Sequence, residues 1–142
     1  VHLTQVNESD INILASKKVR VSICPRSNLK LGVGLPPLPK FLNNKLLVSI
    51  GTDSLASNDD LNIFGEMLAL RRHFPQIPGE LILEMATLNG AKTLNLSKDY
   101  GSIEKGKKAP LLLVNLTPSD NESVLDSVIQ AGCQERITWL SE

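Results

Sequence analysis

The sequence predicts an α/β protein in which helices connect parallel strands. Two short apolar segments, residues 19–24 and 46–50, have the composition of buried strands, and helical patterns lie before and after them. Such alternation of helix and strand is typical of parallel sheets with crossover helices. Both segments are nearly continuous hydrophobic runs, as expected when helices cover both faces of the sheet.

The first half of the chain contains three expected helices and these two strands. Capping residues over 7–10 precede Ile11, Leu14 and Ala15 at helical spacing, which predicts a helix. The strand over 19–24 stops at a proline, and we expect a loop over residues 25–34. The spacing of apolar residues then predicts a short helix over 38–42, the second strand and a longer amphipathic helix over 61–70.

The second half predicts further helices and then strands. Pro78 suits the first turn of a helix that Asn89 and Gly90 are expected to end. A short helical segment is expected over residues 91–96, followed by turns at two glycine-containing segments. The remaining elements are a strand over 111–114, a short helix over 124–129 and a last strand over 136–140.

Composition excludes several classes of protein. The 15 basic and 15 acidic side chains balance to a net charge of zero, so nothing favours nucleic acid or an anionic membrane as partner. No apolar run is long enough to span a bilayer. Cys24 and Cys133 are too few for a disulfide framework, and the N-terminus has no secretory pattern, so we expect a cytoplasmic protein. The chain starts in mid-pattern without Met, which suggests truncation.

Asp53 is the leading candidate for chemistry. It follows the strand over 46–50 directly, at the end where barrels and open α/β sheets place catalytic groups. A carboxylate there can bind a divalent cation or accept a proton from a metal-bound water. The alternative is that Asp53 only turns the chain or caps the next helix.

The loop after the first strand is expected at the same end of the sheet. Arg26, Ser27 and Asn28 would then lie near Asp53 and hold a polar substrate. The alternative, favoured for Asn28, is that these side chains only satisfy loop backbone groups. Neither His2 nor His73 has a second ligand at metal-binding spacing, and His73 is expected on a solvated helix end.

Several motifs together point to a family. Residues 24–34 read Cys-Pro-Arg-Ser-Asn-Leu-Lys-Leu-Gly-Val-Gly, and residues 51–61 read Gly-Thr-Asp-Ser-Leu-Ala-Ser-Asn-Asp-Asp-Leu. With Glu66-Met67 and the later segments 85–91 and 101–107, this pattern strongly resembles the cytosine deaminase-like and chlorohydrolase-like branch of the amidohydrolase superfamily. The resemblance extends to about residue 114.

The resemblance implies the C-terminal portion of a (β/α)8 TIM barrel plus part of a small β-sandwich. Residues 1–105 would be the barrel part with its following helices, and residues 106–142 the sandwich part. The strand over 19–24 resembles the seventh barrel strand and that over 46–50 the eighth, with residues 1–3 as the stump of the sixth. One departure is Pro110, where the family has an aspartate.

The resemblance also implies a chemistry, in which Zn²⁺ or Fe²⁺ activates water for hydrolytic deamination. Substrates of the branch are aminated purines and pyrimidines, their nucleosides, or triazines. The motif sequence of this chain is most similar to deaminases of adenosine, S-adenosylhomocysteine, methylthioadenosine or aminofutalosine. Asp53 would bind the metal and handle the proton. His2 matches the second His of a His-Cys-Val-His-Leu pattern and would have a structural role next to the residues that bind the metal. The residues expected to contact substrate are Arg26, Ser27, Asn28, Ser54 and Ser57.

Only Asp53 of the family's metal ligands maps onto this chain. One carboxylate does not retain a transition metal, which takes three or four protein ligands. We therefore expect the chain alone to hold no metal and to be inactive, as a truncated gene product or proteolytic remnant. It would self-associate or pair with a missing N-terminal part, and the intact enzyme would act on a small molecule. The alternative is a degenerate relative that serves as a binding or scaffold module.

Overall fold

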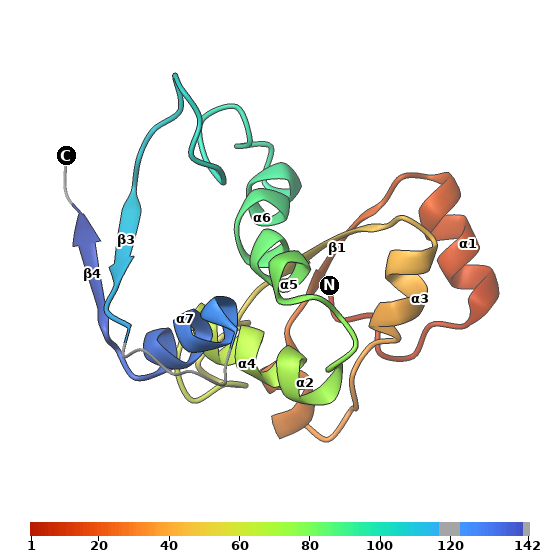
Figure 1. Cartoon of the computed structure of the whole chain (residues 1–142). Coiled ribbons are helices and arrows are strands. Elements are labelled where there is room, and N and C mark those ends of the chain that lie inside the picture. Colours follow the sequence, from red (N-terminus) through yellow and green to blue (C-terminus); the bar gives the residue numbers. More distant parts are fainter. Residues whose placement is uncertain (117–122, 141–142) are drawn as a thin grey trace.

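Two parallel strands, β1 (Arg20–Ile23) and β2 (Leu47–Ile50), form the first sheet of the protein. The computed structural model describes residues 1–116 and 123–140. The parallel pairing expected from the sequence is confirmed, in a register that sets Ile23 beside Ile50. Figure 1 shows α1 (Glu8–Ser16) and α3 (Leu38–Asn43) on one side of this pair and the later helices on the other.

Local sequence signals explain the first helices. The Asn7 side chain accepts from the Asp10 backbone N–H at 3.1 Å, and the Asp10 carboxylate accepts from the Asn7 N–H at 3.0 Å. This capping box satisfies donors that a helix start leaves free, and it confirms the predicted start of α1. The predicted helix over 38–42 is α3, and that over 61–70 is α4 (Ile63–His73), which Asn62 caps.

One hydrophobic core joins these elements. Both strands direct side chains into it, and burying one aliphatic or aromatic side chain contributes about 1.5–3 kcal/mol. Helices α4, α5 (Gly79–Ala86) and α7 (Val124–Cys133) supply most of the opposite wall. The largest fully buried apolar side chains are those of Phe41, Ile11, Ile23, Leu38, Met67, Leu70, Ile82, Met85 and Ile129.

The expected loop over residues 25–34 is wrong in its first half, which forms helix α2 (Pro25–Lys30). Proline at the first position of a helix is favourable because its missing N–H has no partner there anyway. The backbone N–H of Arg26 donates to the Glu66 carboxylate at 2.8 Å, 40 residues away. This distant acceptor at the helix start could not be seen in the local sequence.

The expected helix end at Asn89–Gly90 is also wrong. Helix α5 ends earlier, with Thr87 as its C-cap, and both Asn89 and Gly90 lie inside α6 (Leu88–Thr93). The Thr87 hydroxyl donates to the Leu83 carbonyl at 2.7 Å, a side-chain bond that competes with the helix backbone. Asn89 is buried, so tertiary packing keeps this dipeptide helical.

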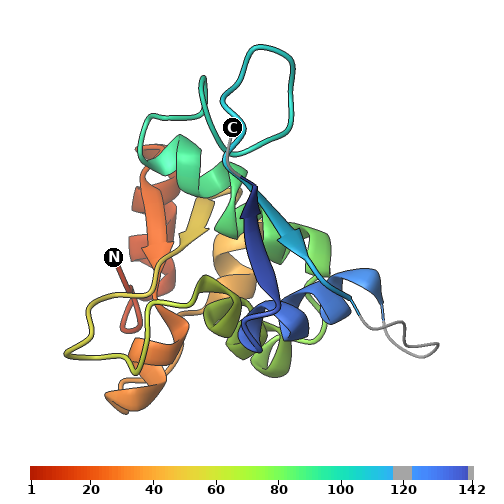
Figure 2. The same cartoon turned by 90° about the vertical axis from the view of Figure 1, so that its left-hand side faces the viewer.

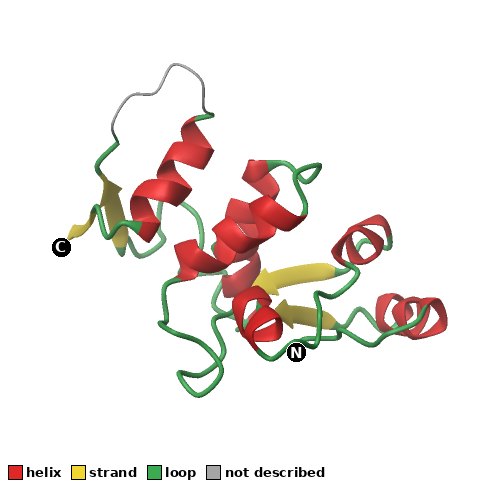
Figure 3. Cartoon of the chain, turned by 90° about the horizontal axis from the view of Figure 1, so that it is seen from below, coloured by secondary structure: helices red, strands yellow, loops and turns green. Residues whose placement is uncertain are grey.

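The C-terminal part contains a second sheet. Strands β3 (Leu111–Val114) and β4 (Ile137–Leu140) pair antiparallel, as Figure 2 shows. Between them α7 continues to Cys133, beyond the expected 124–129, and packs on α4. Figure 3 shows the two sheets in separate parts of the molecule with helices between them. The proposed division at residue 105 stays a prediction, and residues 117–122 and 141–142 lie outside the described residues.

Across residues 1–116 and 123–140, no helix is long and apolar enough to cross a membrane.

Candidate functional site

Asp53 lies at the carboxyl end of β2, two residues after Gly51. Because β1 and β2 are parallel and in register, the segment after β1, helix α2, begins beside it. The Asp53 backbone has a φ of +61°, in the left-handed region that non-glycine residues seldom adopt. A strained backbone of this kind persists only where surrounding contacts hold it, and it is frequent at functional sites.

Two hydroxyl groups hold the Asp53 carboxylate. Its Oδ2 accepts from Ser27 Oγ and from Ser57 Oγ, each at 2.7 Å. The hydrogen bonds from Ser57 and Ser27 lower the pKa of Asp53 below its usual value, so the carboxylate is ionised at neutral pH. Ser27 is fully buried on α2, whereas Ser57 lies in the loop after Asp53. The two serines therefore hold one carboxylate oxygen from two different segments of the chain.

His2 lies next to the same carboxylate. Its backbone N–H donates to the Ser22 carbonyl of β1 at 2.9 Å, and its ring Nε2 is 3.9 Å from Asp53 Oδ2. On the other edge of the ring, Nδ1 is 2.8 Å from the Asn28 Oδ1. A proton on Nδ1 satisfies this bond and leaves Nε2 facing Asp53. Asn28 thus contacts a histidine ring rather than loop backbone, and the interpretation favoured for it from sequence is wrong.

The buried Asn28 amide is only partly satisfied. Its Nδ2 has no hydrogen-bond partner within the described ranges, although the residue is 1% exposed. Ser54 is exposed in the loop after Asp53, and its carbonyl accepts from the Ser57 N–H. Asn28 and Ser54 lie on the segments that adjoin Asp53, and their role as substrate contacts stays a prediction.

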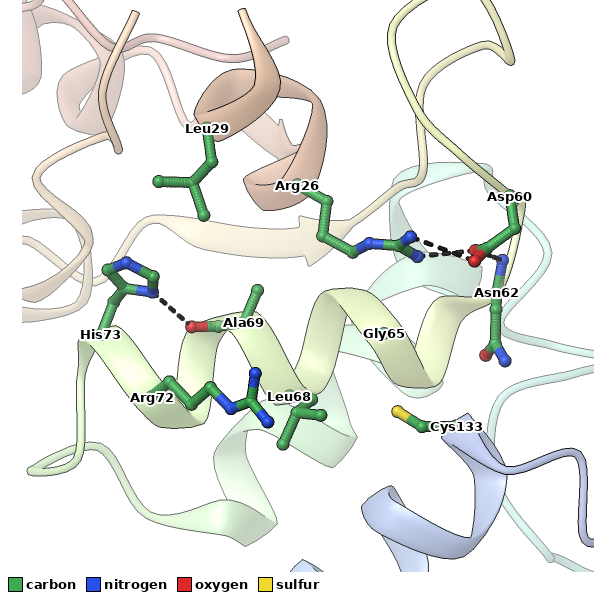
Figure 4. Close-up of a pocket in the computed structure, with 10 residues that line it drawn as sticks. All are labelled: Arg26, Leu29, Asp60, Asn62, Gly65, Leu68, Ala69, Arg72, His73 and Cys133. Atoms are coloured by element: carbon green, nitrogen blue, oxygen red, sulfur yellow. Dashed lines mark hydrogen bonds and ion pairs between the residues drawn. The ribbon is translucent and has the colours of Figure 1, made fainter. Parts of the chain in front are cut away.

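Arg26 points elsewhere. Its guanidinium forms a bidentate pair with Asp60 at 2.6 and 3.0 Å, and Figure 4 shows it directed along α4. There it lines a groove of about 390 Å³ between α2, α4 and α7. The expectation that Arg26 projects toward Asp53 is wrong because α2 is helical, so neighbouring side chains leave it about 100° apart. His73 lies exposed at the end of α4, as predicted.

Sequence reasoning did not identify Glu66 as a site residue. This carboxylate on α4 is 0% exposed and accepts from the Arg26 backbone N–H at 2.8 Å and Asn58 Nδ2 at 2.7 Å. Burial raises its pKa above the usual value, although both hydrogen bonds oppose the shift. A signal existed in the sequence, because Ala69 and Leu70 lie three and four residues later on the same helix face. A charge on an apolar face indicates a buried polar contact.

The residues present do not form a metal site by themselves. Among residues 1–116 and 123–140, no three His, Cys, Asp or Glu side chains gather as metal ligands would. Burial, with the nearby Asp53 and Glu66 charges, raises the pKa of the Cys24 thiol to about 11, so the free thiol is protonated at neutral pH. Asp53 can offer one carboxylate, and a zinc site takes three or four protein groups.

Comparison with known proteins identifies the family. The chain matches the model of the amidohydrolase family over residues 1–138. It is 42% identical over 122 residues to the 5-methylthioadenosine/S-adenosylhomocysteine deaminase of Moorella thermoacetica, which covers 81% of this chain and 28% of that protein. It is 39% identical over 132 residues to the 5'-deoxyadenosine deaminase of Methanococcus vannielii, covering 84% of this chain and 31% of that protein.

A solved structure agrees. An adenosine deaminase from Xanthomonas campestris with bound zinc superposes with a TM-score of 0.85 at 34% identity, over 96% of this chain and 34% of that one. The chain thus spans about a third of the length of its relatives. The resemblance found from the motifs and the α/β fold class of a partial amidohydrolase barrel are both confirmed. The chain belongs to the amidohydrolase family.

Proposed function

We propose that this chain supplies the C-terminal part of the active site of a metal-dependent hydrolase that deaminates an adenosine-type nucleoside. The observation that carries the proposal is the Asp53 carboxylate, held by two serine hydroxyls at the carboxyl ends of parallel strands. Its lowered pKa keeps it ionised at neutral pH, and the ionised form is the one that binds a cation or accepts a proton. The relatives named as adenosine-type deaminases support the substrate class.

Zinc is the metal that the solved relative with bound zinc supports, and Fe²⁺ suits a carboxylate ligand as well. Such a metal supplies Lewis-acid activation of water. Asp53 would contribute one ligand and hold the proton released from the water. The other ligands have to come from outside the described residues, so pairing with further family elements is part of the proposal.

The neighbouring side chains receive roles that follow their contacts. Ser27 and Ser57 orient Asp53, which leaves their hydroxyl protons committed to the carboxylate rather than to substrate. His2 and Asn28 stabilise the surroundings of Asp53 through their mutual hydrogen bond. Ser54, exposed beside Asp53, remains the proposed substrate contact. A small nucleoside as substrate and a cytoplasmic location are part of the proposal.

The test is a chimeric enzyme in which residues 1–142 replace the matching segment of the Moorella thermoacetica deaminase. We expect zinc-dependent ammonia release from methylthioadenosine, S-adenosylhomocysteine or adenosine. Asp53→Asn should lower kcat by about 10²–10⁴-fold, the usual contribution of a group that transfers protons. Asp126→Asn, remote from the site, is the matched control that also removes one carboxylate charge. A folded chimera that releases no ammonia, or an Asp53→Asn variant as active as its parent, contradicts the proposal.

The second candidate function is a binding or scaffold module, and the incomplete ligand set among the described residues favours it. Calorimetric titration of the 142-residue chain with Zn²⁺ addresses it directly. We expect no stoichiometric binding, because a lone carboxylate holds zinc weakly. Tight one-to-one binding would show that the chain carries a metal site of its own.

A further inference from the structure

Glu66 is a fully buried carboxylate, and the apolar core around it gives no reason for a charge at this position. It lies on α4 at 0% exposure, where desolvation disfavours an ionised side chain. Leaving such a group unpaired would be costly, and both of its oxygens are hydrogen-bonded. The destinations of these two bonds explain what the charge does.

The first bond reaches the start of α2. Glu66 Oε2 accepts from the Arg26 backbone N–H at 2.8 Å. Arg26 is the immediate neighbour of Ser27, whose hydroxyl donates to Asp53. Because the first N–H groups of a helix have no partner within it, a carboxylate here both satisfies and locates the helix start.

The second bond reaches the loop around Asp53. Glu66 Oε1 accepts from Asn58 Nδ2 at 2.7 Å, and the same amide nitrogen donates to the Thr52 carbonyl at 2.8 Å. Asn58 is 2% exposed and follows Ser57, the other donor to Asp53. Thr52 directly precedes Asp53. One carboxylate therefore connects to both chain segments that hold the Asp53 side chain.

The charge of Glu66 is balanced nearby. Arg26 Nε lies 4.0 Å from Glu66 Oε1, while the tips of the same guanidinium pair with Asp60. Gly65 makes room for this arrangement, since a Cβ there would lie 2.5 Å from Arg26 Nη1. Figure 4 shows the guanidinium lying beside α4 on its way to Asp60, with Gly65 on the helix next to it. The Arg26 guanidinium thus balances the charge of Glu66 and does not face Asp53.

We infer that Glu66 is a positioning residue, which fixes Asp53 by holding the start of α2 with one oxygen and the Asp53 loop with the other. Asp53 needs such support because its backbone is held in the left-handed region, where surrounding contacts must determine the conformation. The contacts of Glu66 do not depend on the reaction, and the importance of Glu66 for catalysis rests on the proposed function.

Solution NMR of the full 142-residue chain tests the geometry without an activity. In Glu66→Gln, one of the two donors meets an amide NH₂ instead of an oxygen, so at least one connection breaks. We expect the backbone resonances of Asp53 to shift and the Arg26 amide to exchange faster with solvent. Glu66→Asp, which keeps two acceptor oxygens on a shorter side chain, should restore these signals in part.

Two further variants separate positioning from general stability. Asn58→Ala removes the bond to Glu66 together with the bond to the Thr52 carbonyl, and leaves the Glu66 bond to Arg26, so Asp53 and Ser57 should shift while the Arg26 amide keeps its protection. This variant also decides the question if Glu66→Gln fails to fold. Asp126→Asn removes a carboxylate from the Arg71 pair between α4 and α7, and should lower stability without shifting Asp53. Asp53 resonances unchanged in both Glu66→Gln and Asn58→Ala would overturn the inference.

The chimeric deaminase gives the second readout. Glu66→Gln should lower kcat by about 10–100-fold, the range found when groups that orient metal ligands are removed. Asp126→Asn should leave kcat within twofold of the parent. An inactive parent chimera overturns the proposed function and leaves the NMR result standing, whereas an active parent with unaffected Glu66→Gln overturns the positioning role.

Discussion

The packing of α7 on α4 depends on a glycine, and this contact yields a quantitative prediction. Gly132 on α7 is buried against the Phe64 ring of α4. A Cβ at Gly132 would lie 2.2, 2.3 and 2.6 Å from three ring atoms, where carbon atoms in contact are about 3.5–4.0 Å apart. In Gly132→Ala the two helices must separate by more than about 1 Å, or the ring must leave its site.

The cost can be worked from these two effects. Overpacking a buried contact costs about 1–3 kcal/mol, and we place this ring-face clash near the upper end. Alanine in place of glycine inside a helix returns about 1 kcal/mol. Gly132→Ala should therefore lower the free energy of unfolding by about 1–2 kcal/mol, which corresponds to a fall in Tm of roughly 3–7 °C for a chain of this size.

Urea unfolding followed by circular dichroism and by the fluorescence of Trp139, the single tryptophan, measures this change. Phe64→Leu should cost less in the Gly132→Ala background than in the parent, because the smaller side chain relieves the clash. The double-mutant cycle should show a coupling of about 1 kcal/mol. If the two substitutions are additive, or Gly132→Ala is as stable as the parent, the described packing of α7 is wrong.

Three further predictions concern other elements. Asn7→Ala removes the cap of α1 and should cost about 1 kcal/mol, seen as a lower urea midpoint. Ile82→Ala, at a position with 0% exposure, should cost about 2–5 kcal/mol in the same measurement. The Arg71 guanidinium lowers the pKa of Asp126, so their pair stabilises the fold above the ordinary aspartate value of about 3.9 and is lost as pH falls through the lower folded value. Urea midpoints measured from about pH 6 to 2 should therefore fall less steeply for Asp126→Asn than for the parent.

Elements with strong local signals were predicted well from the sequence. The capping residues at Asn7 and Asp10 place α1, and the apolar spacing over 61–70 places α4. Both central strands were recognised from apolar runs that end at a proline or at Gly51. In each case the signal, a pair of capping residues or a run of apolar residues, lies within a few residues, so the sequence nearby contains the information.

Elements that depend on distant partners were predicted poorly. Helix α2 begins where a carboxylate 40 residues later accepts its first N–H, and Asn89 and Gly90 stay helical in α6 because tertiary packing buries Asn89. The direction of the Arg26 side chain follows from the helical geometry of α2. Because a loop was expected there, this direction was not predicted. Asp60, its partner, lies 34 residues away.

For the candidate site, the sequence by itself determined that Asp53 follows a buried strand in a parallel sheet, because hydrophobic runs and turn residues set strand ends locally. Only the tertiary structure decided which groups surround that carboxylate, with Ser27 and Ser57 at its oxygen and the His2 ring beside it. It also decided that Glu66 binds the segments on which both serines lie. Hydrogen bonds and burial depend on distances between segments that lie far apart in the chain, and folding alone brings those segments together.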